Sequence, residues 1–312
     1  MGFTRFTPGS IRGPERTRAS AFRGWAFHKA ELSFTIIVFG SGPVRRSFIT
    51  MKYQLAEDVK PQVVLLIAAT VISVALWVIS WYLPIVGYVT YPLQLFATFI
   101  HEGSHALMTI LTGNRVMSLT VSPDGSGVVW SQASGFSQLL ISSAGYLGTT
   151  AFGVILLAWI RFGYSARVAL YVAAGFVGLM TLVFGFLAPF WNLLERVTFG
   201  SVIFTVFSGT VLAVGLFAAA RYAPVKWVNF ALAFLAVQCL LNAFFSLKDL
   251  FIISAAGGQT SDAANMAAAT GIPSILWVLI WIVISVGMIS AGLRLYAVSR
   301  GSASKAETVF ED

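Results

Sequence analysis

A short motif in the first half of the chain carries the residue types best suited to catalysis. It reads His101-Glu102-Gly103-Ser104-His105, which is HExxH. If this stretch is helical, the two histidines lie about one turn apart on one face, so both imidazoles can reach one metal ion. Zn²⁺ binds neutral imidazole nitrogens with a third protein ligand, and catalytic sites keep one position for water. Glu102 stands beside the first histidine, where it can take a proton from such a water. The motif therefore predicts a hydrolytic zinc site.

The motif lies in an apolar stretch, Leu93–Leu111, that is predicted to be helical. His101 would lie roughly 12 Å along that helix, close to the middle of a bilayer. Ionisable side chains at this depth are costly unless they pair or bind a metal. The alternative interpretation is two hydrogen-bonded core histidines beside a buried glutamate. The third histidine, His28, has no partner near it in the sequence, and we favour zinc at the motif.

The composition identifies the environment in which this motif must work. Hydrophobic residues make up 57% of the 312 residues and charged residues only 10%, whereas soluble domains carry about 25% charged residues. This excludes a soluble globular protein and predicts a multi-pass integral membrane protein in contact with the lipid bilayer. The single cysteine, Cys239, excludes an internal disulfide bond.

The positive charge is concentrated at the N-terminus. Residues 1–50 hold 8 Lys/Arg against 2 Asp/Glu, which accounts for most of the net charge of +8. Because the remainder lacks a basic face interleaved with aromatic residues, we expect no nucleic-acid partner. Residues 1–60 are predicted to be a disordered basic segment. A transit peptide, or an extension ahead of a natural start at Met51, remains an alternative. Residues 61–299 are predicted to form the membrane domain and 300–312 a polar tail.

The predicted fold is an all-α polytopic membrane bundle. We count seven apolar spans, or six if one is broken or re-entrant. They lie near Val63–Leu83, Leu93–Leu111, Gln138–Ile160, Ala166–Leu187, Ser201–Ala220, Trp227–Ser254 and Ser274–Val298. The segment Pro84–Pro92 is expected to be a short connection between the first two.

One stretch after the HExxH helix has a different pattern. Residues Arg115–Val121 alternate, residues 122–127 contain Pro-Asp-Gly, and Val128–Trp130 is again rich in β-formers. This predicts a short β-hairpin in which Asp124 is a turn residue. A free edge of that hairpin could hold an unwound peptide by adding it as a strand.

Taken together, the HExxH motif in an apolar helix, the hairpin, and the following Gly145-Tyr146-Leu147-Gly148 resemble the site-2-protease family of intramembrane zinc metallopeptidases. Within this group, peptidase family fifty, the likeness is to the shorter B-like branch, and it covers roughly Leu93 to Trp281. The resemblance implies Zn²⁺ as cofactor. It also implies a membrane-protein substrate, cleaved within or beside a transmembrane segment.

The resemblance also implies an aspartate as third zinc ligand. The comparable stretch here runs from Asn242 to Asp249, without the prolines and the glycine of better-known members. Asp249 is the preferred ligand, although along a straight helix it lies roughly 33 Å from the end at which the histidines are about 12–18 Å deep. The other interpretation of Asp249 is a helix-end charge paired with Lys248. Asn242 is a weaker candidate for stabilising the oxyanion, or it hydrogen-bonds between helices.

Three other carboxylates remain. Asp262 is the alternative third ligand; it follows a glycine-containing loop that would have to fold back into the bundle, and its surroundings are typical of a helix N-cap. Glu195 and Asp124 are weaker candidates. The function favoured by the sequence is intramembrane zinc proteolysis with Glu102 as general base. A membrane zinc hydrolase of a lipid or small amide, and a non-catalytic transporter or scaffold with the same fold, are the alternatives.

Overall fold

The computed structural model describes residues 32–38, 47–53, 60–80, 82–194, 197–257 and 261–296. The chain divides into two units, Met1–Gln54 and Leu55–Asp312. In the first unit, strand β1 (Leu32–Val38) pairs antiparallel with strand β2 (Ser47–Tyr53). Both strands fall within the segment that the sequence predicts to be disordered. Most of the remainder of that segment, and the polar tail 300–312, lie outside the described residues.

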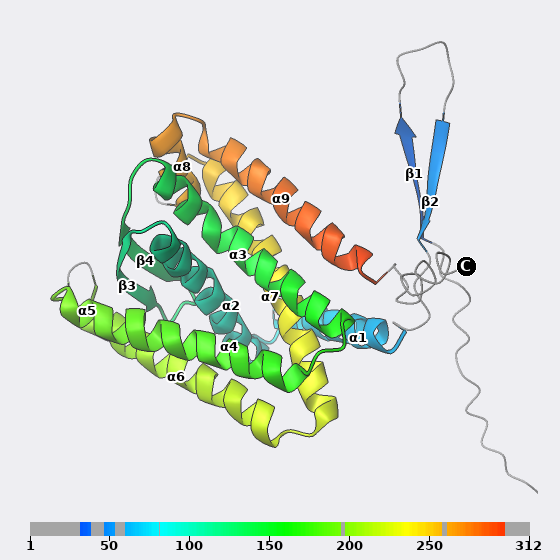
Figure 1. The fold of residues 1–312 in the computed structure, drawn as a ribbon, viewed down its shortest axis with the longest axis horizontal. Coiled ribbons are helices and arrows are strands. Elements are labelled where there is room, and N and C mark those ends of the chain that lie inside the picture. Colours follow the sequence, from blue (N-terminus) through cyan, green and yellow to red (C-terminus); the bar gives the residue numbers. More distant parts are fainter. Residues whose placement is uncertain are drawn as a thin grey trace, which may run out of the picture. The chain divides into compact units, whose positions relative to one another are not determined.

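The second unit is built mainly from helices (Figure 1). Among the described residues, six are long and apolar enough to cross a membrane, in agreement with the predicted six to seven spans. They are α1 (Lys60–Ser80), α3 (Phe136–Arg161), the span Ala166–Trp191, α6 (Phe199–Tyr222), α7 (Val225–Ala255) and α9 (Ser274–Arg294). The span Ala166–Trp191 consists of α4 (Ala166–Met180), the π-helical η2 (Thr181–Leu187) and α5 (Ala188–Trp191).

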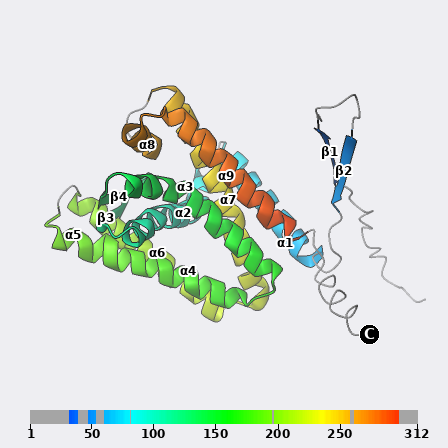
Figure 2. The ribbon, with the colours of Figure 1, turned by 45° about the horizontal axis from the view of Figure 1, so that its top comes forward.

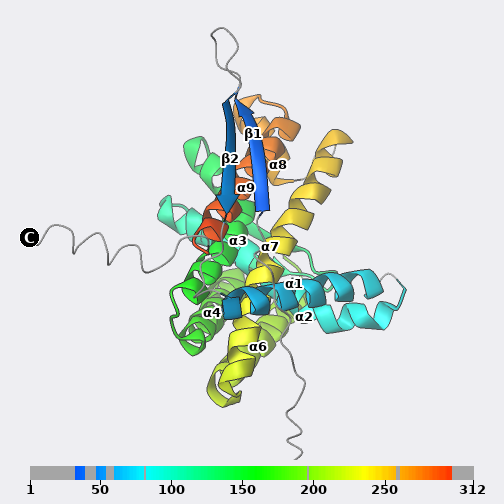
Figure 3. The same cartoon turned by 90° about the vertical axis from the view of Figure 1, so that its right-hand side faces the viewer.

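The HExxH motif lies on α2 (Pro84–Leu111), which is not one of these six spans. The helix begins at Pro84 rather than at Leu93, so the segment expected to be a connection is helical. Proline is well tolerated at the start of a helix because the first N–H groups have no intrahelical acceptor. From Leu95 to Thr109 most of α2 is buried. The helix runs through the middle of the bundle, between α3 and α4 (Figures 1 and 2). Its first half lies beside α1 (Figure 3).

Small residues allow α3 to approach α2 closely. A Cβ atom added at Gly148 would lie within 3.0 Å of the Ser104 side chain. Close packing of this kind, rather than apolar burial, holds membrane helices together, since lipid is as apolar as the helix surfaces. The approach brings the α3 backbone against the face of α2 that carries the histidines.

The predicted hairpin is present. Strand β3 (Arg115–Val121) pairs antiparallel with β4 (Gly127–Gln132), with an irregularity between Val116 and Ser118. The Ser122 N–H donates to the Ser126 carbonyl, and Gly125 has a φ of +84°, a conformation that favours glycine.

The two edges of the hairpin have different surroundings. On β3, the Val121 N–H donates to Thr205 Oγ1 of α6 at 2.8 Å, and the Met117 carbonyl accepts from Asn192 Nδ2 at 2.9 Å. Along a strand of an antiparallel pair, the backbone N–H and C=O groups point alternately toward the partner strand and away from it. Gly127 is opposite Val121. The backbone groups of Gly127 and Val129 therefore point to the outer edge of β4. Among the described residues, no strand pairs with that edge.

A short helix, α8 (Asp262–Thr270), follows α7 and packs against α3 and α9. It lies at the end of the bundle next to the start of α9 (Figure 2). Its start is fixed by Ser261, whose Oγ accepts from the Ala264 N–H at 3.1 Å. Ala263 and Met266 are fully buried against Leu247, Val278 and other apolar residues. These contacts hold α8 against the bundle.

Candidate metal centre

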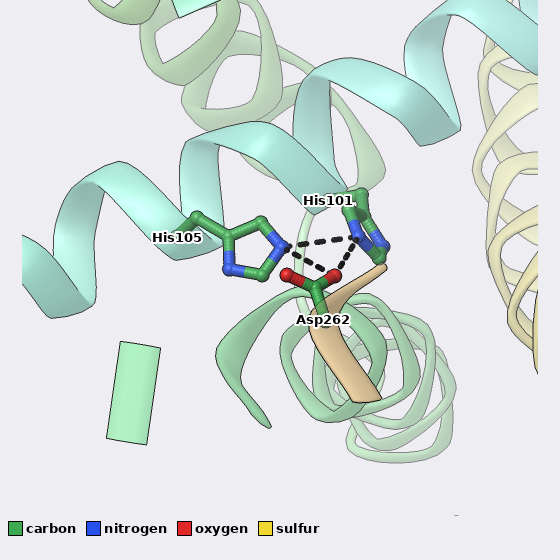
Figure 4. A group of neighbouring side chains, drawn as sticks. All are labelled: His101, His105 and Asp262. Atoms are coloured by element: carbon green, nitrogen blue, oxygen red, sulfur yellow. Dashed lines mark hydrogen bonds and ion pairs between the residues drawn. The ribbon is translucent and has the colours of Figure 1, made fainter. Parts of the chain in front are cut away.

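Three side chains from two separate elements meet at one point (Figure 4). His101 and His105 extend from α2, and Asp262 is the first residue of α8. The two histidine Nε2 atoms are 3.1 Å apart, and Asp262 Oδ2 lies 3.8 Å from His101 Nε2 and 3.4 Å from His105 Nε2. All three candidate ligand atoms lie within 4.8 Å of one another.

These distances fit one tetrahedral ion. Ligand atoms that each bind Zn²⁺ at about 2.0–2.2 Å are separated by about 3.3–3.6 Å in a tetrahedral arrangement, and the three observed separations fall around this range. Two imidazoles and a carboxylate are also a ligand set typical of catalytic zinc. Burial acts to raise the pKa of Asp262, but the charge and hydrogen bonds of the two imidazoles lower this pKa by a larger amount. The net effect holds the pKa of this carboxyl below its usual range, which keeps it ionised for metal binding.

The backbone of α3 comes close to both imidazoles at this point. A Cβ atom added at Gly145 would lie within 3.0 Å of the Nε2 atoms of both His101 and His105. Any larger residue at this position would therefore occupy the place toward which both imidazoles point. In the Gly145-Tyr146-Leu147-Gly148 segment, the first glycine thus lies against the two histidines of α2 and the second lies against Ser104 of the same helix.

One histidine is oriented by a backbone carbonyl. His105 Nδ1 lies 2.6 Å from the Ile141 carbonyl oxygen, so Nδ1 carries the proton and donates it. In the neutral imidazole, Nε2 is then the nitrogen without a proton, and it is directed at the other two ligands, as metal binding requires. The sequence gives no signal for this contact, since any residue at position 141 supplies a carbonyl.

Glu102 lies beside the metal centre on the side of the hairpin. It is 5% exposed. A Cβ atom at Gly127 would lie within 3.0 Å of its carboxylate, and the Val129 N–H donates to this carboxylate. Glu102 therefore stands between the metal ligands and the outer edge of β4. The role of Gly127 was not foreseen from the sequence.

Asp249, the preferred third ligand from the sequence, lies elsewhere. Its carboxylate is exposed and 2.8 Å from Lys248 Nζ, and it is not part of the group at the histidines. Asp262 lies there instead. The physical reason is that α7 continues as a helix from Val225 to Ala255, so Asp249 stays near one end of this long helix, whereas Asp262 begins the separate helix α8.

Asn242, proposed for the oxyanion, lies one turn before Ser246, and Ser246 Oγ donates to its Oδ1 at 3.5 Å. It lines a cavity of about 320 Å³ together with Asp249, Gln94 and residues of α1. Neither histidine nor Asp262 lines this cavity. Among the described residues, Asn242 therefore has no recorded contact with His101, His105 or Asp262.

Asp124 has the turn role that was expected. The Ser126 hydroxyl and N–H donate to Asp124 Oδ1 at 2.6 and 2.9 Å, and these bonds hold the pKa of Asp124 below its usual range. Glu195 and His28 lie outside the described residues.

Comparison with known proteins identifies the group to which the chain is related. A family model described as Peptidase M50B-like matches residues 65–292, which include the HExxH motif, the hairpin and Asp262. No curated protein and no solved structure matches the chain. The family match and the six apolar helices make this a multi-pass integral membrane protein. The chain belongs to the Peptidase M50B-like family of membrane metallopeptidases.

Proposed function

We propose that the protein is a zinc-dependent intramembrane endopeptidase that cleaves peptide bonds in or next to transmembrane segments of other membrane proteins. His101, His105 and Asp262 would hold the ion, and Glu102 would act as general base. The observation that carries this proposal is the position of Glu102. It lies between a cluster of three potential zinc ligands and an open strand edge.

The ligand set is supported by its geometry. The separations of 3.1, 3.4 and 3.8 Å fit a single ion without movement of the helices. Glycine at position 145 supports it too, because any side chain there would collide with both imidazoles. When bound, Zn²⁺ would lower the pKa of a water and polarise the scissile carbonyl.

Glu102 is placed to move protons rather than to bind the metal. It follows His101 directly on α2, so its side chain leaves the helix at about 100° from that of the histidine. Its carboxylate would take a proton from the attacking water as the oxygen bonds to the carbonyl carbon. It would then deliver this proton to the amine nitrogen as the C–N bond breaks.

The hairpin edge favours a peptide substrate over a lipid or a small amide. A transmembrane helix keeps its carbonyls bonded within itself, so its backbone must unwind before hydrolysis. The outward backbone groups of Gly127 and the Val129 carbonyl on the outer edge of β4 offer partners to such a strand. That edge also lies directly at Glu102, so a peptide paired there would pass the general base.

The experiment compares membranes of cells that make the wild-type protein with membranes of cells that make Glu102→Gln. New protein N-termini would be measured by quantitative N-terminal proteomics. We expect termini within or beside predicted transmembrane segments that appear only with the wild type. Glu102→Gln should still carry zinc, because this residue is a base and not a ligand.

Two results would contradict the proposal. One is an identical set of N-termini with both proteins. The other is a change in membrane lipids or small amides that depends on Glu102 while the N-termini stay the same; this would favour the alternative hydrolase. Equal production and equal zinc content of the two proteins serve as the control.

A further inference from the structure

The two histidines of the metal centre are supported differently. His105 is fixed by its bond to the Ile141 carbonyl. Among the described residues, the polar contacts of His101 are with His105 and Asp262, which are themselves candidate ligands. No backbone carbonyl or outer carboxylate among them orients its ring. Ligating histidines almost always have such a partner, so the orientation of His101 needs another support.

That support is an aromatic ring from α3. The ring of Tyr146 meets the imidazole of His101 nearly at a right angle, with centroids 4.6 Å apart and an interplanar angle of 86°. Edge-to-face pairs of this kind are favourable because the positive edge of one ring meets the negative face of the other. Tyr146 directly follows Gly145, whose backbone approaches both histidines. The contact can orient the imidazole through ring packing rather than through a hydrogen bond.

Tyr146 is in turn held by α9. Its ring stacks on Trp281 with centroids 5.3 Å apart and an interplanar angle of 19°. Trp281 is 1% exposed, and its Nε1–H donates to Ser143 Oγ at 3.0 Å. Ser143 and Tyr146 lie one turn apart on α3. Trp281 therefore contacts the same face of α3 at two points, and its indole cannot rotate without losing one of them.

Trp281 also belongs to the apolar cluster that holds α8. That cluster includes Ala263 and Met266, which follow Asp262 within one helical turn and are fully buried. Because one turn of helix is rigid, the position of these two residues sets the position of the Asp262 carboxylate. Trp281 thus supports two candidate ligands indirectly. It supports His101 by packing on Tyr146, and it supports Asp262 by packing in the cluster that holds α8.

We propose that Tyr146 and Trp281 are positioning residues of the metal centre and that they set its affinity and geometry through His101 and Asp262. The inference rests on the proposed zinc site. Loss of a partner that orients a metal ligand typically lowers metal affinity by about 10- to 100-fold. Removal of the Tyr146 ring should therefore weaken zinc binding by about tenfold or more.

The experiment uses the full-length protein in detergent, with variants Tyr146→Phe, Tyr146→Leu and Trp281→Leu. Zinc affinity is measured by competition with a chelator, and ligand geometry by the visible absorption of Co²⁺ bound in place of zinc. We expect Tyr146→Leu and Trp281→Leu to weaken zinc and to shift the Co²⁺ spectrum. Tyr146→Phe keeps the ring and should retain both the affinity and the spectrum.

The chain offers a matched control at the other end of α3. Trp159 also donates its indole N–H, to the Ser165 carbonyl at 3.0 Å, and also contacts a tyrosine ring, that of Tyr164. It lies roughly 20 Å along the helix from Tyr146. Trp159→Leu should lower thermal stability without any change in zinc affinity or Co²⁺ spectrum.

The outcomes separate this inference from the proposed function. If the wild type binds no metal, the zinc site itself fails and the inference fails with it. If the wild type binds zinc and Tyr146→Leu binds it with equal affinity and an unchanged Co²⁺ spectrum, only the positioning role is overturned. Weakening by Tyr146→Phe to the same extent as by Tyr146→Leu would overturn it too, since the hydroxyl and not the ring would then be responsible. Because Trp281 is fully buried, Tyr146→Leu decides the result if Trp281→Leu does not fold.

Discussion

Two glycines allow the proposed metal-binding role of the site to be tested separately from its proposed proton-transfer role. Gly145 on α3 lies against the Nε2 atoms of both histidines, and Gly127 on β4 lies against the carboxylate of Glu102. The same small change, glycine to alanine, should therefore have different consequences at the two positions. Gly145→Ala should abolish zinc binding, whereas Gly127→Ala should leave zinc in place and stop turnover.

The magnitudes follow from the space available. An added Cβ would lie less than 3.0 Å from both imidazole nitrogens, while ordinary contacts begin at 3.4 Å. Each ring would have to retreat by at least about 0.4 Å, and metal–ligand distances tolerate only about 0.2 Å. We expect a loss of zinc affinity of about 100-fold or more for Gly145→Ala. General-base catalysis contributes about 10²- to 10⁴-fold, so Gly127→Ala should lower turnover by at least about 100-fold.

Zinc content by mass spectrometry and affinity by chelator competition would be measured for both variants, with membrane-peptide cleavage as the readout of turnover. Gly175→Ala on α4 is the matched control, because nothing lies within 4 Å of its added Cβ. It should bind zinc normally and gain about 0.5–1 kcal/mol of stability, as expected for this change within a helix. Wild-type zinc affinity in Gly145→Ala would show that the ion does not lie between the two imidazoles.

Three further outcomes are expected. His105→Ala should lose zinc, because it removes one of three ligands and the Ile141 contact together; one bound zinc per chain in this variant would show that the histidines are structural. Ser131→Pro should reduce peptide cleavage more than zinc content, because by alternation the Ser131 N–H points to the outer edge of β4; unchanged cleavage would remove that edge from the mechanism. A chain that starts at Met51 should insert and bind zinc, since every candidate ligand lies in the unit from Leu55 onward, and failure to insert would assign topology to the basic segment.

Helices and the hairpin could be predicted because each has a local signal. Spans such as α3 and α6 are long apolar runs. The hairpin is indicated by alternating apolar and polar residues around a Pro-Asp-Gly turn. The start of α2 was harder to predict, because a proline such as Pro84 can either interrupt a helix or be its first residue. That His101 and His105 share one face of α2 follows from their helical spacing, and in the structure their Nε2 atoms are 3.1 Å apart.

The third ligand depends on tertiary structure that no local pattern encodes. Asp249 matched the order of motifs, yet α7 ends only at Ala255 and leaves this side chain beside Lys248. Asp262 reaches the histidines because apolar contacts of Ala263 and Met266 anchor α8 against the bundle. Its position just after Ser261, typical of a helix start, indicates the short helix but not the direction in which that helix lies.

The most direct test of the metal centre is bound zinc per chain in Asp262→Asn and Asp249→Asn, prepared side by side with the wild type. Both changes replace one carboxylate by an amide of the same shape. One zinc per chain is expected in the wild type and in Asp249→Asn, whose carboxylate pairs with Lys248. Asp262→Asn should lose most of its zinc, because this carboxylate is the only one among the described residues that groups with both histidines. Retention of zinc by Asp262→Asn together with its loss from Asp249→Asn would contradict the account.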